Sequence, residues 1–197
     1  VGIHSDGGIV VLTGKRPTVL DPTSQSKSEH PDFGMIAGSL RGLGDGGLPN
    51  YIGVPSMPYM TRPNYIGVEF AGYQVNDPGN EDYAPPSLKI SADRNPEQMI
   101  DRRKLLAQFD RFQREIDNRQ NMERVDKFRD IAFEMMTNPA TREAFDINQE
   151  PAELRDKYGR NTWGQSCLMA RRLAEAGTAV VNIYFNTPKT GDEFTNW

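Results

Sequence analysis

The feature that most constrains the fold is a helix-forming segment followed directly by the strongest strand pattern in the chain. Residues 178–185 are rich in β-branched and aromatic side chains, as expected of a central strand that is covered on both faces. Gly177 stands just before them and is the expected C′ residue of a helix over residues 163–176. A helix, a glycine and an apolar strand form one αβ unit, so the sequence predicts the α/β class.

A capping box predicts where that helix begins. Thr162 is the expected N-cap, and Gln165 lies three residues later, where its side chain can bond back to the cap. The residues expected on the buried side of the helix are Leu168, Leu173 and Ala176. Gln165 also belongs to a polar group with Arg155, Asp156 and Arg160. We expect this group to brace the surrounding loops through charge-assisted hydrogen bonds, which is a structural role.

An earlier αβ unit is predicted over residues 30–54. Pro31 suits the first position of a helix, which the glycines after residue 41 would end. The apolar residues of this helix share one face: Phe33, Ile36 and Leu40. Residues 51–54, Tyr-Ile-Gly-Val, predict a short buried strand that Pro55 closes.

The rest of the chain is predicted in three parts. Residues 56–86 are rich in Gly, Pro, Asn and Tyr and predict an irregular loop, which is uncommon at this length unless it lines a site. Residues 95–138 predict a helical hairpin, because apolar side chains recur there at spacings of three and four. Short helices are expected over residues 141–146 and 150–159. We therefore predict a single partial α/β domain over residues 1–197.

Composition excludes several classes of function. The 197 residues carry a net charge of −4, with a pI near 5.3, so a nucleic-acid-binding surface is not indicated. No apolar run approaches the roughly 20 residues that a membrane-spanning helix needs. The single cysteine, Cys167, excludes an internal disulfide framework, and its position in a predicted helix favours a small core residue. The chain is expected to be an internal piece of a longer protein.

The amino-terminal residues include the polar cluster that is best suited to catalysis or ligand binding. His4, Ser5 and Asp6 precede two glycines and the apolar residues 9–12. Those apolar residues fit either a short buried strand or a helix with Ser5 or Asp6 as N-cap and Gly14 as C′ residue. We favour the helix, whose first turn would set free backbone N–H groups beside the three polar residues and so favour an anion.

A tetrapeptide follows this cluster and carries a resemblance to known proteins. His4 stands nine positions before Thr13 in Leu-Thr-Gly-Lys, residues 12–15, and this resembles the segment of sulfatases in which the nucleophile precedes Leu-Thr-Gly-Arg. The whole chain resembles the large bacterial family called domain of unknown function 1501 (DUF1501), which is similar to sulfatases and to the alkaline phosphatase superfamily. Further matches follow in order at residues 30–34, 48–52, 144–146, 150–151, 155–160 and 164–168.

The resemblance implies a fold, a site and a partner. The fold would be part of an alkaline-phosphatase-like or sulfatase-like three-layer sandwich, with the helical hairpin as an insertion. The site would include His4, Ser5 and Lys15 as catalytic residues, and His4 as a ligand of a divalent metal, zinc, calcium or magnesium. The substrate would be a small anionic ester, or a sulfated or phosphorylated glycan. The family resemblance also suggests export to the periplasm or cell envelope.

In the same resemblance, an Asp-rich segment would lie before Val1, and a Trp-Asp-Thr-His segment would begin at or just after Trp197. The remainder of the protein's own chain is therefore an expected partner, because it would supply further metal ligands. This piece would then be inactive by itself.

The individual residues leave alternatives open. A neutral imidazole at His4 suits a metal ligand or a general base, or it simply caps the helix, and the adjacent Ser5 could substitute as nucleophile with Asp6 orienting it. Lys15 could supply a point charge to an anion or be an ordinary surface lysine. His30 could belong to a site or merely precede a helix.

Three functions therefore remain in competition. The first is a hydrolase of anionic esters, and the second is a non-catalytic exported binding protein on the same scaffold. The third is an interaction domain built on the helical hairpin. Replacement of the sulfatase nucleophile by His4 favours the second, and retention of Leu-Thr-Gly-Lys favours the first.

Overall fold

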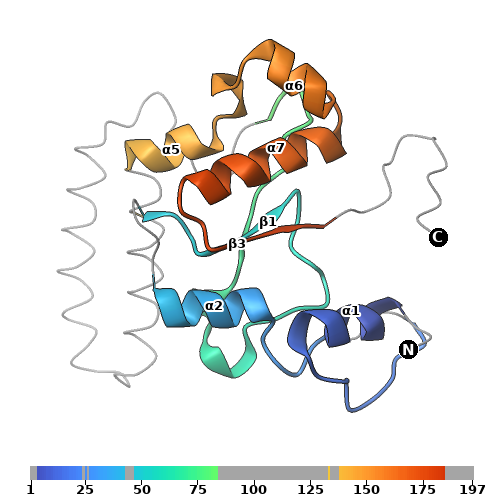
Figure 1. Cartoon of the computed structure of the whole chain (residues 1–197). Coiled ribbons are helices and arrows are strands. Elements are labelled where there is room, and N and C mark those ends of the chain that lie inside the picture. The colour runs from blue at the N-terminus through green and yellow to red at the C-terminus, as the bar shows by residue number, and fades with distance from the viewer. Residues whose placement is uncertain are drawn as a thin grey trace, which may run out of the picture.

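The structure is a computed structural model that describes residues 4–23, 25, 27–42, 47–83, 133 and 138–184. Within those residues, five α-helices and a small parallel sheet form a mixed α/β fold, which confirms the predicted class (Figure 1). The helices are α1 (His4–Thr13), α2 (Phe33–Arg41), α5 (Pro139–Phe145), α6 (Ala152–Tyr158) and α7 (Thr162–Glu175). The strands are β1 (Tyr51–Val54), β2 (Tyr73–Gln74) and β3 (Val180–Ile183).

Helices cover both faces of the sheet. α2 contacts β1 and β3 from one side, and α7 contacts the same two strands from the other. Figure 1 shows α5, α6 and α7 together on the α7 side, with α1 and α2 on the opposite side. The described part of the molecule therefore has a helical layer, a sheet and a second helical layer.

Among the described strands, β1 is the central one, whereas the sequence favoured residues 178–185 for that position. β1 pairs in parallel with both β2 and β3, so the order is β2-β1-β3 in the described part of the sheet. All four residues of β1 are buried, whereas those of β3 are only half-buried. β3 does have helices on both faces, as predicted. Its strong apolar pattern indicated burial of the faces, but strand order depends on pairing partners that no local pattern specifies.

The hydrophobic core lies between the sheet and the α7 side. Side chains alternate across a strand, so Ile52 and Val54 point toward α5 and α7, and both are completely buried. They pack in one cluster with Phe145, Leu168 and Leu173, which are equally buried. Full burial of each such side chain stabilises the fold by about 1.5–3 kcal/mol. This core fixes the position of the carboxyl ends of β1 and β3.

The predicted limits of α7 are nearly correct, but its capping is different. The helix ends before Gly177, which has φ +104°, as the prediction required. At the other end, Asn161 is the N-cap and its side chain accepts a hydrogen bond from the Gly164 amide at 2.9 Å. Thr162 is already helical, and its hydroxyl donates to Asp77 at 2.6 Å. Asn caps at least as well as Thr and comes one residue earlier, so the predicted capping box does not form.

The predicted apolar face of α2 does not face the core. Phe33, Ile36 and Leu40 do share one face, but they are 52%, 40% and 82% exposed. The buried face contains Gly34, Met35 and Gly38 instead. A Cβ atom on Gly34 would lie 2.5 Å from the ring of Tyr51, so the small residue lets the helix approach the strand closely. The glycine face packs inward because β1 presents the large Tyr51 ring on this side of the sheet.

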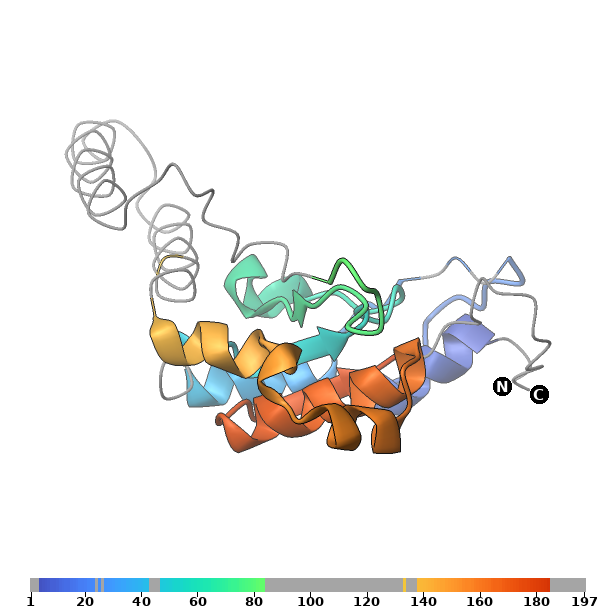
Figure 2. The same cartoon turned by 90° about the horizontal axis from the view of Figure 1, so that it is seen from above.

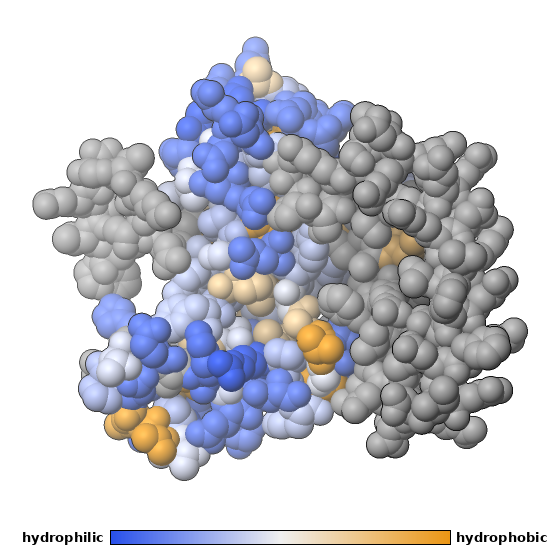
Figure 3. Space-filling model, turned by 180° about the vertical axis from the view of Figure 1, so that it is seen from behind, coloured by the Kyte–Doolittle hydropathy of each residue, from blue (hydrophilic) through white to orange (hydrophobic). Residues whose placement is uncertain are grey.

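In Figure 3, the coloured part of the face is mostly hydrophilic and carries a few small hydrophobic patches. No helix among the described residues is long and apolar enough to cross a membrane.

The predicted irregular loop contains more structure than expected. Within residues 56–86, the 3-10 helices η2 (Asn64–Ile66) and η3 (Val68–Phe70) are followed by β2. The Val75 amide then donates to the Gly53 carbonyl at 2.9 Å and continues this pairing. The short helices expected before α7 are confirmed as α5 and α6. The helical hairpin predicted over residues 95–138 lies outside the described residues, apart from Phe133 and Asn138.

Candidate functional site

The carboxyl ends of the strands define the edge where a site is expected. The chain passes from β1 to β2 on one side and later to β3 on the other, so the direction of winding reverses at β1. Open α/β sheets bind ligands beside such a reversal, at the carboxyl ends of the strands. Figures 1 and 2 both show α1 beside the end of the sheet toward which β1 and β3 point. The amino-terminal cluster therefore lies near the expected edge.

The helix interpretation of the amino-terminal segment is correct. α1 ends at Thr13, the Gly14 amide donates to the Val10 carbonyl at 2.9 Å, and Gly14 has φ +68°. The helix is held against the loop that follows β1. Its Ile9 is 2% exposed, and a Cβ atom on Gly8 would lie 2.9 Å from the methyl carbon of Met60. Gly8 and Ile9 thus form part of the docking face of α1, together with the buried Ser5 and Asp6.

The predicted site residues of α1 are placed in different environments. Ser5 and Asp6 are completely buried in the first turn, whereas His4 and Lys15 are exposed. His4 begins the helix and Lys15 lies two residues past its end, so the length of the ten-residue helix, about 15 Å at 1.5 Å per residue, separates them. The structure therefore brings His4, Ser5 and Asp6 into one turn. It keeps His4 and Lys15 too far apart to contact the same small anionic group.

A buried carboxylate that the sequence did not single out lies near the same edge. Asp32 is the N-cap of α2, is completely buried, and accepts a hydrogen bond from the Met35 amide at 2.9 Å. The Tyr51 hydroxyl donates to its other carboxylate oxygen at 3.0 Å, and Asn182 in β3 donates to that hydroxyl at 3.3 Å. Asp32, Tyr51 and Asn182 form what we call the buried polar cluster.

Burial dominates the acid–base behaviour of this cluster. It raises the pKa of Asp32, because charge is disfavoured away from water, although the hydrogen bonds from Met35, Tyr51 and Thr61 act in the opposite direction. Burial likewise raises the pKa of Tyr51, and the nearby Asp32 carboxyl adds to that rise. Asp32 preceding a helix was a recognisable capping signal. Tyr51 and Asn182 are distant from it in sequence, and no sequence pattern predicted that the three residues would form a cluster.

Two loops run side by side over this edge. The Ser28 amide donates to the Met60 carbonyl at 2.7 Å, and the Asn64 side chain donates to the Ser28 carbonyl at 3.1 Å. His30 belongs to this pair of loops, with Nδ1 3.4 Å from the Tyr65 hydroxyl oxygen. His30 also lies two residues before the N-cap of α2, so the structure gives it the helix-preceding position that was one of its two interpretations.

No metal-binding group appears in the part of the chain that the structure describes. There, no three His, Cys, Asp or Glu side chains come together in a way that could hold a metal ion. His4 remains the residue predicted as a ligand, with an exposed imidazole at the start of α1.

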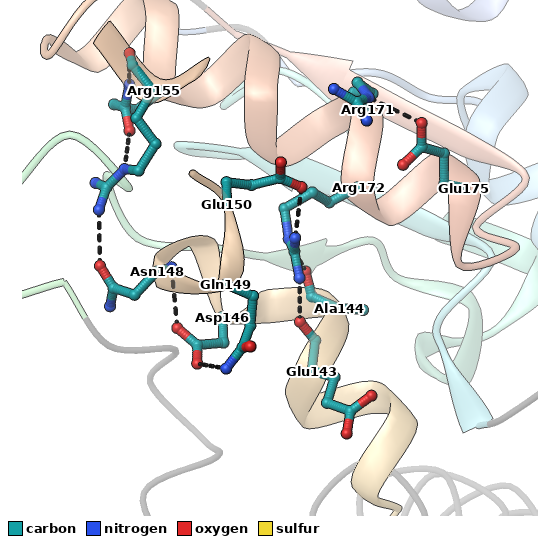
Figure 4. Close-up of polar contacts among 11 residues, drawn as sticks. Glu143, Ala144, Asp146, Asn148, Gln149, Glu150, Arg155, Arg171, Arg172 and Glu175 are labelled. Carbon is teal, nitrogen blue, oxygen red and sulfur yellow. Dashed lines mark hydrogen bonds and ion pairs between the residues drawn. The ribbon is translucent and has the colours of Figure 1, made fainter. Parts of the chain in front are cut away.

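A second set of polar residues has the structural role predicted for it. The Arg155 guanidinium donates to Asn148 at 2.7 Å (Figure 4) and to Gln165 at 2.8 Å. The Gln165 amide donates to the Arg155 and Gly159 carbonyls. Arg160 pairs with Asp156 at 2.5 Å on the surface. These contacts fix the turn between α6 and α7, so this group braces the helical layer.

An ion pair that the sequence did not reveal completes this brace. Arg172 in α7 contacts Glu150 at 2.6 Å, and the two side chains are only 14% and 11% exposed. Arg172 also donates to the backbone carbonyls of Glu143 and Ala144 (Figure 4). It thereby connects α7 to the end of α5 and to Glu150, which lies two residues before α6. Three acceptors satisfy one guanidinium, as burial of a charge requires.

Comparison with known proteins identifies one family. The model of the family described as "Protein of unknown function (DUF1501)" matches residues 2–197. No curated protein and no solved structure matches the chain. The match spans α1, the buried polar cluster and the helical brace.

Proposed function

The chain belongs to the DUF1501 family, and from this premise we propose that it forms part of a hydrolase for an anionic ester, either a sulfate or a phosphate ester. In this proposal the three layers are part of an alkaline-phosphatase-like or sulfatase-like sandwich. The substrate is a small ester or a sulfated or phosphorylated glycan.

The observation that carries the proposal is the placement of α1, whose first turn holds His4, Ser5 and Asp6. Figures 1 and 2 show this helix near the end of the sheet toward which β1 and β3 point, where the direction of winding reverses. The amino end of a ten-residue helix favours an anion through its free N–H groups and dipole. His4 is exposed there, while Ser5 and Asp6 are buried beneath it.

The proposed roles follow from these exposures. The N–H groups of the first turn bind the sulfate or phosphate, and the His4 imidazole takes a proton from the attacking water. The water oxygen bonds to sulfur or phosphorus and the bond to the ester oxygen breaks. That oxygen takes a proton from solvent and leaves as the alcohol, and the His4 imidazolium returns its proton to solvent. Ser5 and Asp6 position the turn. Lys15, at the far end of α1, interacts with an outer part of a longer substrate.

A divalent metal, zinc, calcium or magnesium, is a further element of the resemblance. The described residues around His4 do not themselves fit a metal site, since they gather no three-ligand group. We therefore assign no step of the reaction to a metal ion. Elemental analysis of the purified full-length protein would measure whether one is bound.

The experiment uses the two histidines of the chain as a matched pair. Full-length protein is assayed for hydrolysis of p-nitrophenyl sulfate and p-nitrophenyl phosphate. Loss of a general base typically costs about 10²–10⁴-fold in rate, so His4→Ala should lose at least 100-fold in kcat. His30→Ala, which removes only the contact with Tyr65, should stay near the unsubstituted rate. Equal rates in the His4→Ala variant and the unsubstituted protein would remove His4 from the mechanism.

A second candidate function is a non-catalytic, exported binding protein on the same scaffold. The observation that favours it is the separation of His4 and Lys15, which lie at opposite ends of α1 and are both exposed. Two exposed groups at that spacing suit recognition of an extended anionic glycan better than attack on one ester. Saturable binding of a sulfated glycan by full-length protein, without hydrolysis of either nitrophenyl ester, would support this alternative.

A further inference from the structure

A groove on the outer helical layer is separate from every residue of the proposed site. It lies between α6 and α7 and has a volume of about 790 Å³. The residues that give it its chemistry are Leu154, Lys157, Tyr158, Trp163, Cys167 and Arg171. Sites for small molecules commonly have volumes of about 300–1,000 Å³, so the groove is large enough for one.

The walls of the groove are fixed by backbone contacts. Gly164, which also lines it, lies so close to the Tyr158 and Gly159 carbonyls that a Cβ atom there would be 2.6 Å from the Gly159 oxygen. The Gly159 amide donates to the Arg155 and Asp156 carbonyls and ends α6, while Arg155 and Gln165 bridge the two helices. A groove held in this way is formed before a ligand arrives, which lowers the entropic cost of binding.

The lining combines apolar and aromatic side chains with two positively charged ones. Trp163, Tyr158 and Leu154 are half-buried, and each offers apolar surface to the groove. Arg171 pairs with Glu175 at 2.8 Å, but these side chains are 41% and 59% exposed, so water screens the pair. Lys157 is exposed and has no hydrogen bond or ion pair within the described residues. Two cations beside apolar side chains stand out on a chain whose net charge is −4.

We propose that this groove binds a small anionic amphiphile, a molecule with an aromatic or branched apolar body and one carboxylate, sulfonate or phosphate group. The apolar body covers Trp163 and Leu154, and the anionic group lies between Lys157 and Arg171. Removal of the apolar surfaces from water supplies most of the affinity, and the charges select anions over neutral analogues. This site is independent of the proposed hydrolase function, because it uses none of the same residues.

The sequence offers two specific reporters for a test. Within the 197 residues, Cys167 is the only cysteine and Trp163 is one of two tryptophans, so a Trp197→Phe background leaves Trp163 as the sole indole of this segment. The probe is 8-anilinonaphthalene-1-sulfonate, an anionic aromatic amphiphile. For a ligand of this size, we expect a single site with Kd on the order of 10–100 µM. Binding should quench Trp163 and slow modification of Cys167 by a thiol reagent about fivefold or more.

Charge variants then test the assigned contacts. Lys157→Glu with Arg171→Glu should weaken probe binding about tenfold or more, since each tenfold change corresponds to about 1.4 kcal/mol. Arg62→Gln, an exposed cation on the loop after β1, is the matched control and should bind as the unsubstituted chain does. The neutral analogue N-phenyl-1-naphthylamine should also bind the unsubstituted groove more weakly.

Three results would overturn the proposal. One is unchanged affinity in the double charge variant, and another is full reactivity of Cys167 at saturating probe. The third is a loss of probe binding with rising protein concentration together with dimer formation in sedimentation, because a second copy of the chain would then cover the groove. None of these tests substitutes Trp163, whose replacement could prevent folding.

Discussion

At the scale of single residues, Asp32 shows how one buried carboxyl can join three segments. It caps α2, receives the Tyr51 hydroxyl from β1, and through Tyr51 contacts Asn182 in β3. Burial raises its pKa above the ordinary value, so the folded protein holds a proton on Asp32 at a pH where the unfolded chain has released it. The same residue therefore links the stability of this edge of the sheet to pH.

Replacement of Asp32 by Asn should remove a specific part of the pH dependence. A carboxyl whose pKa is raised by folding stabilises the protein most below its unfolded pKa, about 3.9, and that contribution is lost as pH rises through the folded value. Asp32→Asn keeps a capping acceptor but cannot ionise, so it should gain stability relative to the unsubstituted chain as pH rises from about 3.9. Urea unfolding at several pH values measures this difference.

The control for this prediction is Asp156→Asn, because Asp156 is 63% exposed and pairs with Arg160 on the surface. It should show no comparable change over the same pH range. A parallel pH dependence for Asp32→Asn and the unsubstituted protein would contradict the assignment.

Arg172 and Glu150 form the other residue-scale feature that decides stability. Loss of one partner of a buried ion pair leaves an uncompensated charge and typically costs about 3–5 kcal/mol. Glu150→Gln should therefore lower the free energy of unfolding by several times more than Asp156→Asn, which breaks the exposed pair with Arg160. Chemical denaturation of both variants measures the contrast. Equal effects would mean that water reaches Glu150 in solution.

At the scale of elements, glycines determine how closely helices approach their neighbours. Gly34 lets α2 lie against the Tyr51 ring, and Gly164 lets the first turn of α7 lie against the end of α6. Gly7 in α1 is different, since a Cβ atom there would meet nothing within 4 Å. Helix propensity alone favours alanine at all three positions, so packing alone decides where glycine is needed.

Alanine at these positions should give opposite results. Gly34→Ala and Gly164→Ala should each lower the free energy of unfolding by about 1–3 kcal/mol, because the added methyl group overlaps a ring or a backbone carbonyl. Gly7→Ala should raise it by about 0.5–1 kcal/mol through helix propensity. Thermal and urea unfolding measure these values, and stabilisation by Gly164→Ala would show that α6 and α7 are less closely packed than described.

At the scale of the whole molecule, the sheet and α1 differ in how firmly they are held. β1 and β3 are joined by backbone hydrogen bonds that include Val180 to Asn50 at 2.9 Å and Tyr184 to Val54 at 3.0 Å, and a buried core covers them. α1 is docked through a smaller set of buried residues: Ser5, Asp6 and Ile9. Elements with fewer buried contacts open at lower free energy than the core.

Native-state hydrogen exchange should therefore separate the two regions. Amides of β1 and β3 should exchange only when the whole domain unfolds, whereas amides of α1 should exchange through a local opening of lower free energy. Added denaturant should speed exchange in the strands strongly and in α1 only weakly. Identical exchange free energies for both regions would show that α1 is an integral part of the core.

The candidate site was only partly foreseeable from the sequence. The helical nature of α1 followed from its glycine stop, and the polar brace around Arg155 followed from its charges and amides. The separation of exposed His4 from buried Ser5 required the direction in which the helix docks. The roles of His4, Ser5 and Lys15 in chemistry stay predictions.

By itself the sequence determined the α/β class, most helix limits and the two strands that follow helices, because propensity, capping and periodicity act over a few residues. Only the tertiary structure decided that β1 is central among the described strands, that α2 packs by its glycine face, and that Asp32 meets Tyr51 and Asn182. Those outcomes depend on which surfaces fit together over 19 to 131 residues of separation. No local pattern records that fit.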